Sequence, residues 1–278
     1  GAYAHGACHT QDAVIYGTQN KISVNGGWHD AGDYGRYVVP GAMAVAQMLL
    51  AYEVNPSFME QYTNAAAHKP KLPDYFNELK YELDWMMTMQ REDGALYHKV
   101  SCYNFCGFIL PDQEKEELVI SPVSATATGD FAAATAMAVR FYQKYDAEYA
   151  DRLAAASRRA YEALQNMNIP GGFKNPEEIV TGEYGDPCDE DERYWAAAEL
   201  YKTFGDEKYR RDFEERAAGK IYHGYGWGAM GSYGNLAYIT TSNPVSEELK
   251  EKIKASMIDL GRHKLEIEEV DGYGTALA

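Results

Sequence analysis

Apolar residues recur at helical spacing in several segments that are separated by short polar turns. Tyr75, Leu79, Leu83 and Met86 lie three or four positions apart within residues 73–90, which predicts an amphipathic helix. Similar spacing or Ala-rich apolar runs predict further helices over 37–52, 125–145, 147–164, 189–204, 207–218 and 246–260. Ser246 is the expected N-cap of the last helix, with acidic residues in the first turn after it. The chain is therefore predicted to be all-α.

Two of the predicted helical hairpins resemble each other. Phe141–Tyr149 reads FYQKYDAEY and Leu200–Tyr209 reads LYKTFGDEKY. Each has aromatic residues at the end of the first helix, an Asp in the turn and a Tyr in the next helix. Repeated hairpins are typical of a helical solenoid or a closed α/α toroid. A chance likeness between two ordinary helix turns is the alternative.

Three long stretches between the helices carry no helical pattern. They cover residues 96–124, 168–187 and 219–234, and they contain many Tyr, Trp and Asp residues. Long ordered loops in a compact domain usually carry function, so we expect a site on one rim of the helical body.

Composition excludes several classes of function. The 278 residues hold 26 Lys and Arg against 42 Asp and Glu, a formal net charge of −16, which disfavours both nucleic acid and an anionic membrane surface as partners. Hydrophobic residues make up 46%, enough for a core, but no apolar run is long enough to span a bilayer. The 23 Tyr residues suit stacking on sugars, although we expect most of them simply to pack in the core.

The segment Gly26–Tyr37, GGWHDAGDYGRY, is the strongest candidate for chemistry. Asp30 and Asp33 are separated only by Ala and Gly, and two carboxylates this close can act on one water, one accepting its proton while the other orients it. Trp28 and Tyr34 flank the pair and are candidates for a wall on which a sugar stacks. The alternative is an Asp-rich turn that caps the following helix.

The extended segment GGWHDAGDYGRYVVPG resembles the N-terminal signature of glycoside hydrolase family 9, the inverting cellulases. Four further stretches resemble that family in the same order, so the resemblance covers nearly the whole chain. They are DWMMTMQREDGALYHK (84–99), SPVSATATGDFAAA (121–134), DEDERYWAAAELY (189–201) and YHGYGWGAMGSYGNLAYI (222–239).

The resemblance implies an (α/α)6 barrel, of which residues 1–278 form a partial catalytic domain with about eight of twelve helices. It implies that Asp33 is the general base and that Asp30 helps to hold the attacking water. An inverting glycosidase also needs a general acid across the scissile bond. In the family this acid is a Glu near the C-terminal end of the catalytic domain, and no counterpart is found here, so we expect this chain to be a fragment.

Several aromatic residues and one His are predicted to contact glucose units. The resemblance assigns His98 to the substrate site, and Tyr184, Trp195 and Trp227 join Trp28 and Tyr34 as stacking or hydroxyl-contact candidates. Trp195 lies on an Ala-rich predicted helix, where packing in the core is the alternative.

Cys8, His9 and His29 are candidate zinc ligands. Thiolates and imidazoles bind zinc, and a structural site has four ligands, but this spacing is not that of a zinc finger. The alternative is a surface His cluster beside a buried Cys. The resemblance to a family 9 branch with an N-terminal immunoglobulin-like domain implies a structural zinc here, its remaining Cys lying upstream of residue 1.

A second metal is predicted at the acidic loop Glu183–Glu192. Oxygen-rich turns bind calcium, and the resemblance implies Asp186, Asp189 and Glu190 as ligands. An acidic first helical turn is the alternative, and the family's frequent Asp after the Trp is replaced by Ala229 near Trp227. Cys102 and Cys106 are expected to be either free thiols or a local disulfide, because their spacing does not decide between the two.

These observations predict hydrolysis of β-1,4-glucosidic bonds in cellulose or a related β-glucan, with inversion at the anomeric carbon. We expect a secreted monomer that carries further modules. The alternatives are a fragment that binds glucan without cleaving it, and another carbohydrate-active enzyme built on an α/α toroid.

Overall fold

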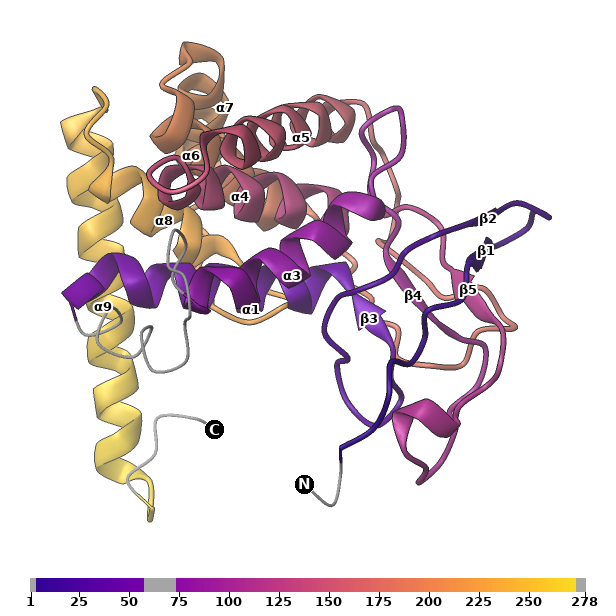
Figure 1. Ribbon diagram of the computed structural model, residues 1–278. Helices are drawn as coiled ribbons and strands as arrows, with labels where there is room; N and C mark the ends of the chain where they lie inside the picture. The colour runs from indigo at the N-terminus through magenta and orange to yellow at the C-terminus, as the bar shows by residue number, and fades with distance from the viewer. Residues whose placement is uncertain (1–3, 58–73, 274–278) are drawn as a thin grey trace.

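The computed structural model describes residues 4–57 and 74–273 and is dominated by helices, as predicted (Figure 1). Pro73, the expected first residue of the second helix, lies outside the described residues. The eight helices labelled within the described part are α1 (Val38–Val54), α3 (Asp74–Thr88), α4 (Ala125–Tyr142), α5 (Ala147–Gln165), α6 (Glu190–Phe204), α7 (Glu207–Gly219), α8 (Gly231–Thr240) and α9 (Glu247–Val270).

The helices form an arc with an inner and an outer layer. Helices α1, α4, α6 and α8 contact one another in that order, while α5 packs on α4, α7 on α6 and α9 on α8. The repeated hairpins of the sequence are the pairs α4–α5 and α6–α7. Asp146 caps α5 by accepting a hydrogen bond from the Tyr149 amide, and Asp206 occupies the equivalent position before α7.

Small residues allow the inner helices to pack closely. Nearly every residue of α4 is buried, and its sequence is rich in Ala and Thr. A Cβ at Gly129 would lie 2.8 Å from the Cβ of Glu192, so α4 and α6 approach each other more closely there than a larger residue allows. The Ala-rich pattern that predicted a helix therefore also marks the inner layer.

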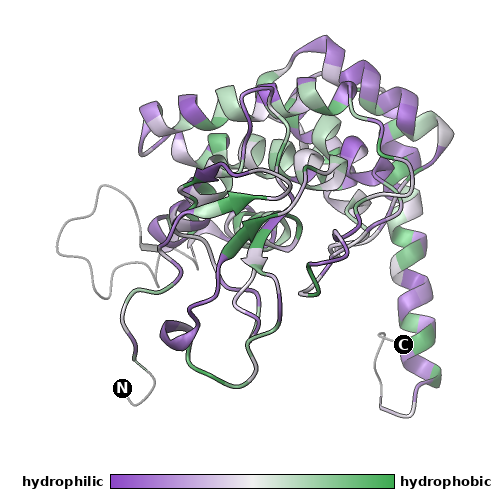
Figure 2. Cartoon of the chain, turned by 90° about the vertical axis from the view of Figure 1, so that its right-hand side faces the viewer, coloured by the Kyte–Doolittle hydropathy of each residue, from purple (hydrophilic) through white to green (hydrophobic). Residues whose placement is uncertain are grey.

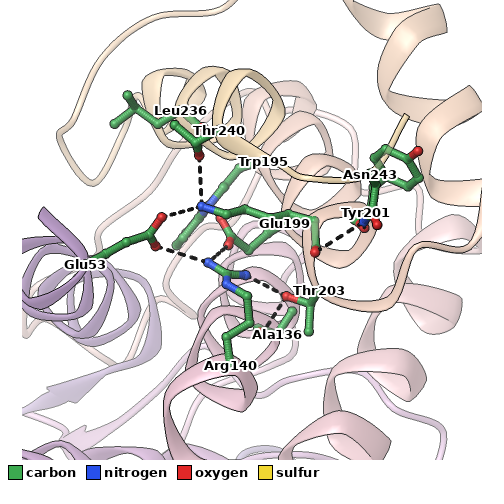
Figure 3. A network of polar contacts seen from close by, with 11 residues as sticks. Glu53, Ala136, Arg140, Trp195, Glu199, Tyr201, Thr203, Leu236, Thr240 and Asn243 are labelled. Carbon is green, nitrogen blue, oxygen red and sulfur yellow. Dashed lines mark hydrogen bonds and ion pairs between the residues drawn. The ribbon is translucent and has the colours of Figure 1, made fainter. Parts of the chain in front are cut away.

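The inner helices α1, α4, α6 and α8 have their C-terminal ends at the same end of the arc. Their C-terminal ends are tied together by buried or half-buried charges (Figure 3). Arg140 of α4 pairs with Glu199 of α6 at 2.6 Å, and Lys202 of α6 pairs with Glu53 of α1 at 2.5 Å and donates to Thr240 of α8. This network fixes one end of the arc and leaves the helix N-termini at the other end.

A small sheet, absent from the sequence prediction, lies beside the N-terminal end of α1 (Figure 1). Its strands are only two to four residues long, too short for an alternating pattern to be recognised. They are β1 (Ala13–Ile15), β2 (Lys21–Ile22), β3 (Arg36–Tyr37), β4 (Lys99–Cys102) and β5 (Leu118–Ile120), in the order β2-β1-β5-β4-β3. Strands β3 and β4 pair antiparallel and set Tyr37 opposite Lys99.

Two C-terminal helices differ from the prediction. Residues 219–234 were expected to carry no helix, and none was predicted before residue 246, but Gly231 and Gly234 both belong to α8. Added Cβ atoms would lie 2.2 Å from the Tyr222 Cβ and 2.7 Å from the Tyr194 ring, so these glycines serve close packing.

Helix α9 begins after the predicted cap, because the Ser246 hydroxyl accepts from the Leu249 amide. The helix continues to Val270, ten residues beyond the predicted end at Leu260. Ile253 is its one fully buried residue, and charged and apolar residues alternate along the rest (Figure 2). Among the described residues, no helix has both the length and the apolar character that crossing a bilayer requires.

Candidate active site

A cleft of about 590 Å³ lies at the end of the arc where the inner helices begin. Its walls come from the loop that precedes α1 and from the three long non-helical stretches, which confirms that these stretches meet on one rim. The lining residues are Asp30, Ala31, Gly32, Asp33, Tyr34, Phe105, Gly107, Phe108, Ile109, Gly182, Glu183, Tyr184 and Trp227. The positive ends of several helix dipoles therefore face a site that contains carboxylates.

Asp33 is 9% exposed and faces the cleft from a hydrogen-bonded pocket. Its Oδ1 accepts a 3.2 Å hydrogen bond from the Gly35 amide, and its Oδ2 accepts from the Tyr37 hydroxyl. These two donors fix the carboxylate in one orientation and stabilise its charge. The carboxylate oxygens retain further lone pairs, so the group can accept a proton from a water in the cleft.

Asp30 is exposed in the same cleft and is held from the opposite wall. The Tyr184 hydroxyl lies 2.9 and 2.8 Å from its two carboxylate oxygens. The Asp30 amide donates to the Gly35 carbonyl at 2.9 Å, so the loop between the two aspartates closes on itself. The Asp pair is thus brought to one cleft by a tight turn, as its spacing predicted.

Backbone strain is concentrated at this cleft. Tyr34 and Tyr184 have φ angles of 54° and 47°, a left-handed conformation that bulky residues rarely adopt. The Tyr34 hydroxyl donates to the Ile109 carbonyl, which connects the segment Gly26–Tyr37 to the loop after β4. Such conformations persist where surrounding contacts impose them, and they cluster at functional sites.

Aromatic side chains form the apolar walls of the cleft. Trp227 is 38% exposed and meets the Tyr184 ring edge-on with centroids 5.1 Å apart. Tyr34, Tyr184 and Trp227 were predicted from the sequence. Phe105 and Phe108 also line the cleft and are exposed, but sequence reasoning missed them because they lie in a loop without periodicity.

Two residues predicted to contact substrate are buried in this structure. His98 is fully buried behind the cleft wall, where Nδ1 bonds the Ser124 hydroxyl at 2.8 Å and Nε2 bonds the Glu183 carbonyl at 2.9 Å. Burial lowers the pKa of His98 to about 3. Trp195 is also fully buried, and its indole donates to Glu199, as expected for a core residue.

Trp28 lies beside the cleft, in a smaller hollow of about 180 Å³ that shares Asp30 with it. Its indole donates to Glu78 of α3 at 2.8 Å, and its amide donates to Glu82 of the same helix at 2.6 Å. A contact between Trp28 and sugar remains a prediction.

Cys8, His9 and His29 come together as predicted for a metal site. One donor atom from each lies within 4.8 Å of the others, and no other trio of His, Cys, Asp or Glu is this compact in residues 4–57 and 74–273. His9 Nδ1 is buried and has no partner in the described part of the chain, while Nε2 bonds the buried Glu114 carboxylate at 2.7 Å. Burial, with the charges of His9 and Arg36, lowers the pKa of His29 to about 4, which favours the neutral ring that binds metals.

This donor set fits zinc. Two imidazoles and a thiol are zinc ligands, and a carboxylate that bonds the far nitrogen of a ligand His orients the ring. Sequence reasoning missed Glu114, which is 105 positions from His9 and reaches it only in the folded chain.

The predicted calcium trio is not assembled. Asp189 pairs with Arg193 at 2.8 Å and Glu190 pairs with Arg216 at 2.7 Å, so arginines already neutralise both carboxylates. Asp186 alone of the three keeps a buried carboxylate oxygen without a partner.

Asp186 instead belongs to a different group of acidic side chains between α4 and α6. Asp130 and Glu192 are fully buried, and no carboxylate oxygen of either has a hydrogen-bond partner among the residues that the structure describes. Burial raises the pKa of both groups, and the charges of Asp186 and Asp191 raise them further. Asp130 and Glu192 lie in two separate family-like stretches, residues 121–134 and 189–201. Only the packing of α4 on α6 brings these carboxyl groups together.

Comparison with known proteins identifies the family. Residues 1–267 match the family model described as glycosyl hydrolase family 9. Endoglucanase D of Acetivibrio thermocellus is 41% identical over 288 residues, covering 99% of this chain and 45% of that protein. This chain therefore belongs to glycosyl hydrolase family 9, and it spans about half the length of the curated relatives it matches.

Solved structures agree with the fold. A single mutant of a thermostable endoglucanase from Alicyclobacillus acidocaldarius superposes with a TM-score of 0.92 at 36% identity, covering 99% of this chain and 53% of that one. A structure described as a Zn-binding triple mutant of a family 9 endoglucanase matches with a TM-score of 0.89 at 32% identity, covering 99% and 54%. The predicted incomplete (α/α)6 barrel is thereby confirmed.

Proposed function

We propose that this chain supplies the water-activating side of a β-1,4-glucanase active site. The observation that carries the proposal is the placement of Asp30 and Asp33 on one cleft, each held by a tyrosine hydroxyl. The aromatic walls are suited to the apolar faces of glucose rings. Membership of the family, and similarity to proteins named as endoglucanases, support the same substrate class.

In the proposed reaction, a water molecule in the cleft attacks the anomeric carbon as the glycosidic C–O bond breaks. Asp33 accepts a proton from this water, and Asp30, oriented by Tyr184, holds the water by a second hydrogen bond. A Glu outside these residues protonates the departing oxygen, as the family resemblance implies. Attack from the face opposite the leaving group inverts the anomeric centre.

The proposal is tested by substituting the two aspartates in the full-length protein. We expect Asp33→Asn to lower kcat on soluble cellulose by at least about 1,000-fold, while cellotetraose binding stays within a few-fold of the wild type. Asp30→Asn should lower kcat less, because it orients the water without taking its proton. Wild-type turnover by Asp33→Asn would refute the assignment, and binding without cleavage by the unaltered protein would support a glucan-binding role instead.

We also propose that Cys8, His9 and His29 hold a structural zinc ion. The buried, unpartnered Nδ1 of His9 and the orienting carboxylate of Glu114 support this assignment. Zinc would anchor the segment that leads into Asp30 and Asp33. Metal analysis of purified protein checks the proposal, and the stoichiometry should fall from one zinc per chain to below about 0.1 in Cys8→Ala.

A calcium ion is proposed at Asp130, Asp186, Asp191 and Glu192 in place of the predicted trio. Unpartnered buried carboxylate oxygens of Asp130, Asp186 and Glu192 support this choice, because hard cations bind oxygen ligands and compensate buried negative charge. Calcium should raise the Tm of metal-stripped protein, and Asp130→Asn should abolish that increase. Secretion, a monomeric state, an immunoglobulin-like module and further modules remain proposals that rest on the family resemblance.

A further inference from the structure

The Tyr37 side chain is confined to a narrow slot beneath the catalytic loop. It is 2% exposed, and its hydroxyl donates to Asp33 Oδ2. Added Cβ atoms at Gly35 and Gly182 would lie 2.6 and 2.9 Å from the Tyr37 hydroxyl oxygen. Two glycines from separate loops thus leave room for this phenol and bring its hydroxyl to the carboxylate.

Lys99 lies directly opposite Tyr37 in the β3–β4 pair. Its side chain is fully buried, with Nζ 5.4 Å from the centre of the Tyr37 ring. Nζ donates to the Thr181 hydroxyl at 3.0 Å and to the carbonyls of Thr181 and Gly182. The ammonium therefore has three oxygen acceptors, all of them uncharged.

A buried ammonium without an adjacent carboxylate is costly. Within the described residues, no Asp or Glu oxygen lies within 4.0 Å of Lys99 Nζ. Burial lowers the pKa of Lys99 to about 8, and the negative charges of Asp33 and Glu183 oppose that decrease. The charge of Lys99 is thus compensated partly by the proposed catalytic base, across the Tyr37 ring.

We propose that Tyr37 and Lys99 are positioning residues that keep Asp33 ionised and in the one orientation suited to take a proton from water. The inference rests on the proposed function. Tyr37 supplies a hydrogen bond that is stronger to the carboxylate than to the protonated acid, and Lys99 supplies positive charge in a region from which water is excluded. Lys99 also holds residues 181–182, directly before the segment that presents Tyr184 to Asp30.

Other charged and titratable groups face Asp33 from the surrounding elements. They are Asp30 and Tyr34 on its own loop, His29 before that loop, Cys106 after β4, and Glu183 and Tyr184 on the loop before α6. Asp30 opposes ionisation of Asp33 because it carries the same charge. Lys99 is the buried cation among these neighbours, which is why its removal should alter the ionisation of the base.

The test is the pH dependence of kcat/KM in the full-length protein carrying Tyr37→Phe. Loss of one donor to a carboxylate should move the acid limb to higher pH by about one unit and lower kcat about tenfold at pH 6, with KM within about twofold. Tyr142→Phe is the matched control, because its buried hydroxyl donates to the Phe76 carbonyl far from the cleft. The control should leave the acid limb unchanged.

Lys99→Met should shift the acid limb in the same direction, and Lys99→Arg, which keeps the charge, should shift it less. Tyr37→Phe alone carries the test if the Lys99 variants do not fold. An acid limb that stays in place in folded Tyr37→Phe overturns the inference, even when Asp33→Asn is inactive. Full activity in Asp33→Asn would instead refute the proposed function itself.

Discussion

Gly27→Ala tests how closely the segment Gly26–Tyr37 is held against α3. Gly27 has φ of +83°, and an added Cβ would lie 2.5 Å from two ring atoms of Trp85, which is fully buried. The positive φ costs an alanine about 1–2 kcal/mol. Displacing Trp85 or the loop adds about 1–3 kcal/mol, so we expect a total destabilisation of about 2–5 kcal/mol.

Gly17→Ala is the matched control for that substitution. Gly17 has φ of +74°, and no atom of the described residues lies within 4 Å of its added Cβ, so only the backbone cost applies. Both variants lose the same freedom in the unfolded chain, and this contribution cancels in the comparison. Urea unfolding monitored by tryptophan fluorescence gives the two free energies. Equal destabilisation by Gly27→Ala and Gly17→Ala would refute the close contact between the loop and Trp85.

Three further predictions concern separate parts of the site. Glu114→Gln should weaken zinc binding about 10- to 100-fold in a chelator competition, because the carboxylate that orients His9 is lost; unchanged affinity would contradict this role. Tyr184→Phe should lower kcat more than it raises KM, since Asp30 loses its hydroxyl donor. Steady-state kinetics on cellotetraose measure both constants, and a larger change in KM than in kcat would contradict this role. His98 has a folded pKa of about 3, below its unfolded value near 6.5, so its contribution to stability is present above pH 6.5 and is lost as the pH falls toward 3. His98→Gln should therefore flatten the dependence of unfolding free energy on pH below 6.5 by up to about 1.4 kcal/mol per unit, and an unchanged slope would argue against a neutral buried ring.

The sequence predicted those parts of the molecule in which neighbouring residues determine the structure. Apolar spacing placed most helices within a few residues of their ends, and the short segment between Asp30 and Asp33 kept the two carboxylates together. Helix α8 was missed because Gly231 and Gly234 usually indicate a loop, and only tertiary packing shows that they allow close helix contacts.

Residues far apart in the sequence were harder to assign. Glu190 appeared available for calcium because its partner Arg216 lies on the next helix, 26 positions away. His98 was assigned to the substrate site through the family resemblance alone, whereas in the fold its ring stacks on Phe173. The pairing of Tyr37 with Lys99 depends on strands of two and four residues, which no pattern in the sequence indicates.

The central claim is that Asp33 activates a water that attacks the anomeric carbon directly. Proton NMR of the full-length protein acting on cellopentaose, recorded within the first minutes, tests this claim most directly. The account predicts that the newly formed reducing ends appear first as the α-anomer, because a single displacement inverts the β-linkage. Initial appearance of the β-anomer would require a covalent intermediate and would contradict the role assigned to the Asp pair.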